Sequence, residues 1–400
     1  MLRKDRSGVD TMLNYDAILV RYGEIGLKSD RVRSRYERAL VDNIKAMLQL
    51  HENEYSNVRR DWGRIFIHSS DEHIADVVAN VFGVVSASPV ISTEPRLNAI
   101  AQLTADVGEA LIGKGESFAI RPHKAGIHPF SSEDIGRVCG AAVAERLTEC
   151  NVSVNLTSPD HEIFVEVRQD RAYVYNNIVK GVGGLPLGTQ GKMVALISGG
   201  IDSPVAAWLM MRRGCEIIPV FYDITPFSDD AMRIKATKCI DILQRWAPNH
   251  LMTVYEIPHG HILQSIKEHC PPKLTCVLCK RMMYLIAVEI AKKEKAYGIV
   301  TGTSLGQVAS QTSANLLAES VGINFPIYAP LIGYDKSEIV TLAKKIGTFD
   351  ISTSSRGECK AVPRRPATSA KVKDVARVEA MLDVPALITR SLHEAKISDR

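Results

Sequence analysis

The second half of the chain alternates between two patterns of apolar residues. Short runs that are wholly apolar, as at residues 193–197, or nearly so, as at residues 215–222, predict strands buried on both faces of a sheet. Longer segments in which apolar residues recur at helical spacing, as at residues 229–246 and 278–295, predict helices between the strands. Strands that alternate with helices predict an α/β fold with a doubly wound parallel sheet. Further strands are predicted at residues 251–257 and 298–301, and further helices at residues 261–269 and 370–382.

The first half has shorter elements and an α+β pattern. Strands at residues 17–20 and 64–67 alternate with helices at residues 30–50 and 72–82, which indicates a small ferredoxin-like unit. A second unit contains a helix at residues 131–147, and its first residues suit a helix cap. The other predicted elements of that unit are a helix at residues 97–112 and strands at residues 118–120, 152–156, 163–167 and 172–175.

Composition divides the chain into domains. Residues 1–12 are too polar to pack and are predicted to be a disordered tail. Residues 181–190 are rich in glycine and are predicted to be a linker. The predicted domains are therefore residues 13–75, residues 76–180 and residues 191–400, and the last of them includes a helical tail at its C-terminus.

The start of the last domain carries the clearest chemical signal. The sequence Ser198-Gly199-Gly200-Ile201-Asp202-Ser203 places a glycine turn between a strand and a helix, and Gly214 is predicted to end that helix. The backbone N–H groups of such a turn and of a helix N-terminus bind phosphate groups. The stretch lacks both the Gly-Lys-Ser/Thr end of a Walker loop and the three spaced glycines of a dinucleotide loop. It therefore predicts a different kind of phosphate or pyrophosphate site.

Charge, hydropathy and cysteine content narrow the class of protein. The formal net charge is +4, which by itself does not predict a nucleic-acid partner. No apolar run is long enough to span a membrane and no charged-then-apolar leader opens the chain, so we expect a cytoplasmic protein without a membrane partner. Eight cysteines without a secretion signal indicate metal or redox chemistry rather than a disulfide framework. Four isolated cysteines are predicted to be small buried apolar residues, namely Cys139, Cys150, Cys215 and Cys239.

Several motifs resemble those of one family of enzymes. The loop Ser198–Ser203 resembles the PP-loop of the ATP pyrophosphatases, which adenylate a substrate and release pyrophosphate. Residues 121–130 resemble the centre of a THUMP domain, an RNA-binding module of tRNA-modifying enzymes. With residues 280–283, 301–312 and 330–336, the chain closely resembles the tRNA 4-thiouridine synthetases, a family also linked in bacteria to thiamine biosynthesis. The resemblance covers about residues 13–370 and implies ferredoxin-like, THUMP and PP-loop pyrophosphatase domains in that order.

The resemblance also implies an ATP site and an RNA-binding segment. Asp202 would support activation of the substrate, with Mg²⁺ offsetting the charge of the triphosphate. The implied nucleotide contacts are Leu196, Ile197, Phe221, Tyr222, Arg281, Gly302 and Gln311, with Ser198, Gly199, Gly200, Asp202 and Ser203 on the pyrophosphate side. The RNA contacts are expected at Arg121, His123, Lys124 and His128.

Thiolation also needs thiols that handle sulfur. Cys276 and Cys279 form a C-x-x-C pair, and Cys359 matches the catalytic cysteine of the family that the chain resembles. In longer members this cysteine works with a rhodanese domain, for which a chain ending at Arg400 leaves no room, so we expect a short form. Three cysteines at one site can instead bind a [4Fe–4S] cluster whose fourth iron carries sulfide. Two alternatives stay open, a Cys359 persulfide with a Cys276–Cys279 redox pair and a structural zinc site completed by Cys270 or His269.

The resemblance therefore implies an ATP-dependent tRNA sulfurtransferase. It would adenylate O4 of a uridine, expected at tRNA position 8, and replace the oxygen with sulfur to give 4-thiouridine, AMP and pyrophosphate. The expected partners are tRNA, sulfide or a cysteine-desulfurase-type sulfur donor, and a second copy of the chain in a homodimer. One alternative is a PP-loop enzyme that adenylates a small molecule, and another is an RNA-binding protein with an inactive nucleotide fold.

Overall fold

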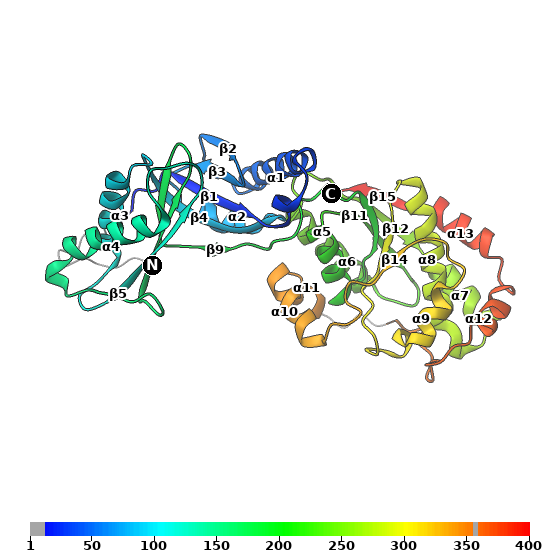
Figure 1. Ribbon diagram of the computed structural model, residues 1–400. Helices are drawn as coiled ribbons and strands as arrows, with labels where there is room; N and C mark the ends of the chain where they lie inside the picture. The colour runs from blue at the N-terminus through cyan, green and yellow to red at the C-terminus, as the bar shows by residue number, and fades with distance from the viewer. Residues whose placement is uncertain (1–12, 355–358) are drawn as a thin grey trace. The chain divides into compact units, whose positions relative to one another are not determined.

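The computed structural model describes residues 13–354 and 359–400, which form two compact units (Figure 1). Most of residues 13–183 belong to the first unit and most of residues 184–400 to the second. The tail predicted at residues 1–12 lies outside the described residues. Each unit is built on a sheet of its own.

The first unit combines a mixed sheet with four α-helices among its described residues. Its strands follow the order β2-β3-β1-β4-β8-β7-β5-β6, and β9 pairs with β4. The strands are β1 (Ala17–Tyr22), β2 (Asn57–Asp61), β3 (Arg64–His68), β4 (Val84–Thr93), β5 (Ser117–Lys124), β6 (Ser153–Val154), β7 (His161–Val167), β8 (Ala172–Tyr175) and β9 (Val179–Lys180). The helices are α1 (Asp30–Leu50), α2 (Ile74–Ala79), α3 (Leu97–Leu111) and α4 (Ser132–Arg146), with 3-10 turns at Glu24–Leu27 and Thr148–Cys150. The cap predicted for α4 is present, since Ser131 and Asp134 form a capping box.

Strand β4 joins the two halves of this sheet. Its earlier residues pair with β1, where Val90 lies opposite Ala17, and its last residues pair with β8, where Ile91 lies opposite Val174. The sequence analysis predicts neither β4 nor β2. Pro89 weakens the strand signal of β4, and β2 is mostly polar, so that neither segment shows a clean apolar alternation.

The sheet of the first unit curls toward the face that α3 and α4 do not cover. These helices pack on apolar side chains that include Ile163, Val165 and Val174. On the opposite face Phe66 of β3 stacks on Tyr173 of β8 with ring centroids 4.5 Å apart, although β1 and β4 lie between their strands. In a flat sheet three strand spacings amount to about 14 Å. The stacked pair therefore requires a strongly bent sheet, and we call this side its concave face.

The second unit has a parallel sheet with one antiparallel edge strand. The strand order is β14-β13-β10-β11-β12-β15. Strands β10 (Lys192–Leu196), β11 (Glu216–Asp223), β12 (Thr253–Pro258), β13 (Ile299–Val300) and β14 (Ile327–Tyr328) run parallel, and β15 (Lys396–Asp399) runs antiparallel to β12. The sequence analysis misses β14 and β15, because β14 has two residues and every residue of β15 is exposed.

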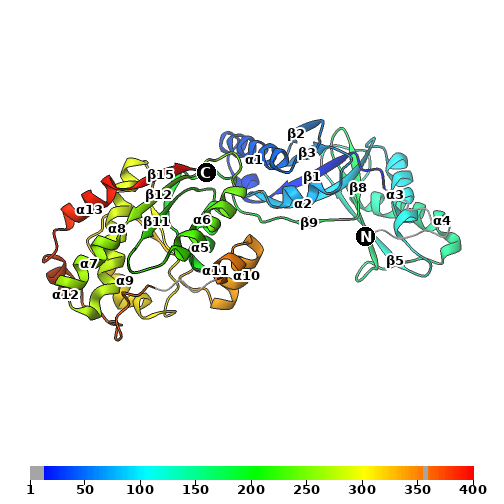
Figure 2. The same ribbon diagram turned by 180° about the vertical axis from the view of Figure 1, so that it is seen from behind.

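Helices cover both faces of this sheet, which confirms the predicted doubly wound fold (Figures 1 and 2). Helices α5 (Asp202–Arg212), α6 (Asp230–Arg245), α10 (Lys336–Ile346) and α11 (Phe349–Thr353) lie on one side. Helices α7 (Gly260–His269), α8 (Thr275–Lys293), α9 (Ser313–Ser320), α12 (Val372–Glu379) and α13 (Val384–His393) lie on the other, with α8 in contact with the remaining four. Short 3-10 turns occupy Pro272–Leu274 and Ala309–Gln311. None of the helices in the described residues is long and apolar enough to cross a membrane.

The strand order places a ligand site at the carboxyl ends of β10 and β13. The chain leaves β10 toward β11 on one side, whereas β13 and β14 lie on its other side. Such a reversal of direction opens a crevice between the two central strands at their carboxyl ends. The loop Ser198–Ser203 follows β10 and residues 301–304 follow β13, so both segments border this crevice.

Candidate nucleotide and thiol site

The loop after β10 folds back onto the first turn of α5. Ser203 Oγ accepts a hydrogen bond from the Ser198 backbone N–H at 2.8 Å, and the hydroxyl oxygens of the two serines are 3.0 Å apart. The Gly200 N–H donates to Ser198 Oγ at 3.3 Å, and Gly199 is buried. The loop is therefore held at the N-terminus of α5, where the helix dipole and free N–H groups stabilise an anion.

Asp202 is the first residue of α5, and two polar side chains from other segments contact its carboxylate. Lys336 Nζ, at the start of α10, lies 2.6 Å from one carboxylate oxygen. Gln307 Nε2, in the segment after β13, donates to the other oxygen at 2.9 Å. The Asp202 side chain is 20% exposed and that of Lys336 is 46% exposed, so a ligand from solvent can reach both. The site thus holds an acid and a cation side by side at the N-terminus of α5.

Gly302 allows the end of β13 to touch the start of α5. A Cβ atom at this position would lie 2.7 Å from the Ser203 backbone nitrogen, a separation that side chains do not adopt. The neighbouring hydroxyl oxygens of Thr301 and Thr303 are 3.0 Å apart and both residues are buried. The ends of β10 and β13 therefore form one continuous rim.

Four other residues predicted to contact ATP lie at the end of β10 and in β11. Leu196 is the last residue of β10, and Ile197, which directly follows it, is buried. Phe221 and Tyr222 lie in β11 and are both buried. The Tyr222 hydroxyl donates to the Met283 carbonyl of α8 at 2.6 Å, which anchors that helix to the sheet.

Gln311 has an unmatched polar atom beside the same rim. Its backbone carbonyl accepts a hydrogen bond from Gly306 N–H at 2.8 Å, which closes the segment after β13 into a compact loop. Its side-chain Oε1 is buried and has no hydrogen-bond partner within the protein. A buried acceptor without a partner is unfavourable, and a donor group on a bound ligand would remove that cost.

Arg281 and Lys280 are adjacent in α8 but have different surroundings. The Arg281 guanidinium holds helices together, since Nε lies 2.5 Å from Glu379 Oε2 of α12 and Nη1 donates to the Val321 carbonyl at 2.7 Å. Lys280 Nζ lies 3.5 Å from Thr303 Oγ1 at the end of β13. Lys280 is therefore the cation of this pair that contacts the rim.

The three cysteines predicted to handle sulfur come from two segments. Cys276 and Cys279 lie three residues apart in the first turn of α8, which begins at Thr275 rather than at residue 278 as predicted, and they share one side of the helix. Cys359 is positioned by Lys360, whose N–H donates to the Phe227 carbonyl at 2.8 Å. All three are free thiols. Cys279 and Cys359 pack against the same apolar cluster of Ile224, Phe227, Leu263 and Ala361.

The thiols influence one another electrostatically. Burial raises the pKa of Cys276 above its usual range, and the neighbouring Cys359 and Glu319 raise it further. Burial also raises the pKa of Cys279, with further contributions from Cys359 and Cys276. Lys280 lowers both pKa values, but burial outweighs it, so both thiols are protonated at neutral pH unless a metal ion binds them.

His259 contacts this group of thiols from the end of β12. Its Nε2 lies 3.4 Å from Cys279 Sγ, and the ring packs edge to face against Tyr222 with centroids 5.3 Å apart. The residue is fully buried, and its Nδ1 has no hydrogen-bond partner. Burial lowers the pKa of His259 to about 3, so its imidazole is neutral at physiological pH.

Glu319 is a buried acid on the other side of Lys280. Its side chain is 0% exposed, neither carboxylate oxygen has a hydrogen-bond partner, and Lys280 Nζ lies 3.7 Å from Oε2. Burial raises the pKa of Glu319 to about 7, and the ammonium of Lys280 limits the rise. The carboxyl group therefore changes charge near neutral pH at the junction of the rim and the thiols.

The residues predicted to bind metal differ in their contacts. Within residues 13–354 and 359–400 no three Cys, His, Asp or Glu side chains are arranged to hold a metal ion. Cys276, Cys279 and Cys359 nevertheless match a three-cysteine cluster site in the number and kind of donors. Of the two optional zinc ligands, Cys270 packs in the apolar core and His269 Nδ1 lies 2.9 Å from the Ser265 carbonyl.

The residues predicted to contact RNA lie in the first unit, and three of them belong to a strand that the sequence analysis ends at residue 120. Arg121, His123 and Lys124 belong to β5, which extends beyond the predicted residues 118–120. Arg121 is already engaged, since Nε lies 2.7 Å from Glu162 Oε1. The ring of His128 follows in the loop and stacks on Phe130, with centroids 5.3 Å apart.

Several polar residues of the site have no role in the sequence analysis. Lys280 and Lys336 lie inside motifs that the sequence shows, but nothing local distinguishes their side chains from solvated cations. His259 directly follows the end of β12, and the rule that ligands bind at carboxyl ends of parallel strands would have singled it out. Gln307 and Glu319 are recognisable only from tertiary contacts.

Comparison with known proteins gives matches along nearly the whole chain. The model of the ThiI ferredoxin-like domain matches residues 17–88, that of the THUMP domain residues 95–177, and that of the thiamine biosynthesis protein (ThiI) residues 188–384. A Methanosarcina mazei protein named "Probable tRNA sulfurtransferase" is 54% identical over 384 residues, which cover 96% of this chain and 95% of the relative. A Methanobrevibacter smithii protein of the same name is 46% identical over 92% of this chain and 95% of its own length.

Solved structures show the same relationship. The crystal structure of a 4-thiouridine synthetase–RNA complex with bound ATP superposes with a TM-score of 0.84 at 30% identity, over 96% of this chain and 99% of that one. The crystal structure of PH1313 from Pyrococcus horikoshii superposes with a TM-score of 0.63 at 26% identity, over 83% of this chain and 99% of that one.

Proposed function

Because the chain belongs to the tRNA sulfurtransferase family, we propose that it is an ATP-dependent enzyme that converts a uridine of tRNA into 4-thiouridine. The observation that carries this proposal is the carboxylate of Asp202 at the start of α5, held between Lys336 and Gln307. A helix N-terminus, a carboxylate and a lysine are suited to stabilise the charges of a reacting triphosphate. The free thiols in the same unit supply the groups that sulfur transfer requires.

In the first step ATP lies on the rim and the uridine is adenylated. We place the triphosphate on the loop Ser198–Ser203 and the adenine near Gln311, whose unpaired Oε1 can accept a hydrogen bond from the exocyclic amino group. Asp202 would hold Mg²⁺, which offsets phosphate charge when bound. Uridine O4 attacks the α-phosphorus, and the bond from this phosphorus to the bridging oxygen breaks. Pyrophosphate leaves on the side of the loop N–H groups and Lys336.

In the second step sulfur replaces the activated oxygen. A sulfide nucleophile adds to C4, and the C4–O bond breaks with release of AMP, so this step requires neither an oxidant nor a reductant. We propose that Cys276, Cys279 and Cys359 hold a [4Fe–4S] cluster, which supplies a fourth iron able to carry sulfide. The donor set fits because the three free thiols influence one another electrostatically and a cation would stabilise their thiolates.

A second route uses a persulfide on Cys359. Its terminal sulfur attacks C4 and displaces AMP, and a thiolate of the Cys276–Cys279 pair then attacks the inner sulfur of Cys359. The thiolated base leaves, and a disulfide forms that an external dithiol must reduce. The neutral imidazole of His259, whose Nε2 lies 3.4 Å from Cys279 Sγ, favours this route because it can hydrogen-bond to the thiol and orient it for the attack.

The remaining partners are proposed on the same basis. We propose that tRNA is the substrate and contacts the first unit, an assignment supported by the RNA in the similar synthetase complex. Sulfide or a cysteine-desulfurase-type protein would supply sulfur, and the enzyme would act as a homodimer in the cytoplasm.

The test is 4-thiouridine formation from ATP, sulfide and tRNA by protein prepared without oxygen. We expect Asp202→Asn to lower the rate by about 10²- to 10³-fold, as does loss of other groups that stabilise transition-state charge. We expect Cys276→Ser to remove bound iron and acid-labile sulfide as well as thiolation, whereas Cys150→Ser, in the first unit, leaves all three unchanged. Iron-free protein that thiolates tRNA when a cysteine-desulfurase-type protein with cysteine replaces sulfide, in the presence of a dithiol, would replace the cluster with the Cys359 persulfide. ATP turnover with a small molecule but not with tRNA would favour the small-molecule enzyme. Absence of any ATP turnover would favour the RNA-binding protein with an inactive nucleotide fold.

A further inference from the structure

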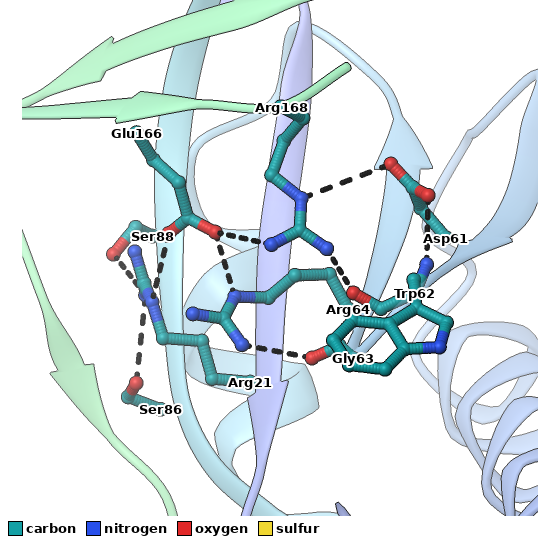
Figure 3. A network of polar contacts seen from close by, with 9 residues as sticks. All are labelled: Arg21, Asp61, Trp62, Gly63, Arg64, Ser86, Ser88, Glu166 and Arg168. Atoms are coloured by element: carbon teal, nitrogen blue, oxygen red, sulfur yellow. Dashed lines mark hydrogen bonds and ion pairs between the residues drawn. The ribbon is translucent and has the colours of Figure 1, made fainter. Parts of the chain in front are cut away.

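The turn between β2 and β3 is fixed from within the first unit, as Figure 3 shows. The Trp62 N–H donates to Asp61 Oδ1 at 2.7 Å, and the Trp62 carbonyl accepts a hydrogen bond from Arg168 Nη2. The Gly63 carbonyl accepts from Arg64 Nη1 at 2.8 Å. Gly63 has a φ of +78°, a conformation that glycine adopts without strain. The backbone of this turn is therefore held by hydrogen bonds to two arginines.

These arginines are in turn anchored by a buried carboxylate on the concave face. Glu166 of β7 is 2% exposed, and its Oε1 lies 2.8 Å from Arg64 Nε and 3.7 Å from Arg168 Nη1. Arg21 Nε lies 3.7 Å from the other oxygen of Glu166. With Asp61, which lies 3.9 Å from Arg168, three arginines face two carboxylates, so the network keeps one net positive charge.

The Trp62 side chain points away from this network into solvent. It is 79% exposed, whereas Trp208 and Trp246 of the second unit pack edge to face with ring centroids 5.3 Å apart. The guanidinium of Arg33, from α1, lies 5.7 Å from the centre of the Trp62 ring. Packing within the unit therefore does not explain why a large apolar ring sits on a rigid turn. A flat ring next to a guanidinium group is the kind of surface on which nucleic-acid bases stack.

The charges around Trp62 favour RNA over a protein partner. Exposed arginines lie on both elements next to the turn, Arg59 and Arg60 on β2 and Arg31 and Arg35 in the first turns of α1. Arg60 also lies 3.8 Å from Glu37, and Arg59 lies over the Phe66 ring. Such a group of cations attracts the phosphates of a nucleic acid. An unpaired base offers a flat face to the indole while its phosphates meet the arginines, and a base inside a duplex cannot stack in this way.

We propose that the Trp62 indole, with the Arg33 guanidinium, is a stacking platform for an unpaired nucleotide of the RNA substrate. This inference rests on the proposed function, in which that RNA is a tRNA. The unpaired nucleotide belongs to the single-stranded 3′ end or to a loop of the tRNA, because both offer the same chemistry. Trp62 thereby contributes to substrate binding and takes no part in adenylation or sulfur transfer.

The test uses the fluorescence of the full-length protein during titration with tRNA. The difference between wild type and Trp62→Phe isolates the emission of Trp62, and we expect tRNA to quench it by stacking. We expect Trp62→Ala to weaken tRNA binding about 5- to 100-fold and to raise KM for tRNA without changing kcat. Trp62→Phe should retain most of the affinity because it keeps an aromatic ring. Leu50→Ala, which truncates another exposed apolar side chain of the first unit, is the matched control and should bind like wild type.

Two further RNAs show which part of the tRNA contains the nucleotide that stacks on Trp62. If tRNA without its single-stranded 3′ end no longer quenches Trp62, the platform binds that end, and if quenching persists, it binds a loop nucleotide. A blunt RNA duplex should not quench Trp62. Equal quenching by the duplex, or unchanged tRNA affinity in Trp62→Ala, would overturn the inference. If the wild-type protein thiolates tRNA and the Trp62→Ala variant binds tRNA with unchanged affinity, the stacking platform is refuted. The proposed function is then retained.

Discussion

Each unit buries a glutamate, and the two glutamates have opposite surroundings. Glu166 in the first unit has three arginines within 3.7 Å of its carboxylate oxygens. Glu319 in the second unit has one lysine at 3.7 Å and no hydrogen bond to either oxygen. Both side chains are almost completely withdrawn from solvent.

The difference indicates two uses for a buried acid. A carboxylate surrounded by guanidinium groups fixes the strands that carry those groups. A carboxylate with a single distant cation is poorly compensated, and burial raises the pKa of Glu319 to about 7. Glu166 therefore stabilises the first unit, whereas Glu319 lowers the stability of the second unit next to the proposed reaction site.

Glu166→Gln should have the largest effect on the free energy of unfolding. It leaves the guanidinium groups of Arg21, Arg64 and Arg168 without their shared anion, and removal of one partner from a buried ion pair typically costs about 3–5 kcal/mol. Urea unfolding followed by amide hydrogen exchange in β1, β3 and β7 reports on this unit. A loss of free energy of unfolding below about 1 kcal/mol would show that the network does not stabilise the fold.

Glu319→Gln should raise the free energy of unfolding, by an amount that depends on pH. Because the pKa of Glu319 is raised from 4.5 to about 7 on folding, its contribution to stability is fully present below pH 4.5 and is lost as the pH rises to about 7. The variant lacks this loss. Its free energy of unfolding should therefore exceed that of wild type by about 3 kcal/mol at pH 8 and equal it at pH 4. Unfolding of the second unit, followed by Trp208 and Trp246 emission at both pH values, measures this. Equal differences at the two pH values would contradict the assignment.

Lys280→Met should have a smaller effect, because it removes the cation that lies 3.7 Å from Glu319. At pH 8 we expect a loss of about 2 kcal/mol in the free energy of unfolding, because the Coulomb attraction across 3.7 Å disappears. The double variant Lys280→Met/Glu319→Gln should lose much less than Lys280→Met alone. Additive effects in this cycle would show that the two side chains do not interact.

Glu162→Gln should have the smallest effect and provides the matched control for Glu166→Gln. Glu162 lies on β7 as Glu166 does, and its Oε1 is 2.7 Å from Arg121 Nε, but its side chain is 42% exposed. Exposed ion pairs contribute about 0–1 kcal/mol. The same urea experiment should therefore show a change below about 1 kcal/mol, and a larger one would mean that burial does not distinguish the two glutamates.

Much of the second unit could be predicted from its sequence because the signals are local. Apolar runs predict β10 and β11, the residues 198–203 predict the loop between β10 and α5, and Gly214, with a φ of +89°, ends that helix as predicted. The resemblance to the 4-thiouridine synthetases, found from such motifs, is confirmed by relatives that match nearly the whole chain. The roles of the individual site residues stay predictions.

The rest could not be predicted because it depends on which strands meet. Nothing in the local sequence of β7 marks Glu166 as the partner of Arg64, which lies on a strand that is not adjacent to β7. Likewise, Gln307 and Lys336 meet at Asp202 only after β13 and α10 have packed beside α5. Pro122 and the polar residues around it conceal the second half of β5, so the sequence analysis ends that strand at residue 120.

Strand β4 constrains how the gene for this protein can change. One stretch of ten residues supplies backbone partners to β1 and, further along, to β8. Insertion of a single codon between Val90 and Ile91 would turn every later side chain of the strand to the opposite side of the sheet. The ferredoxin-like and THUMP portions are therefore expected to be inherited as one block, with length changes confined to the loops around it.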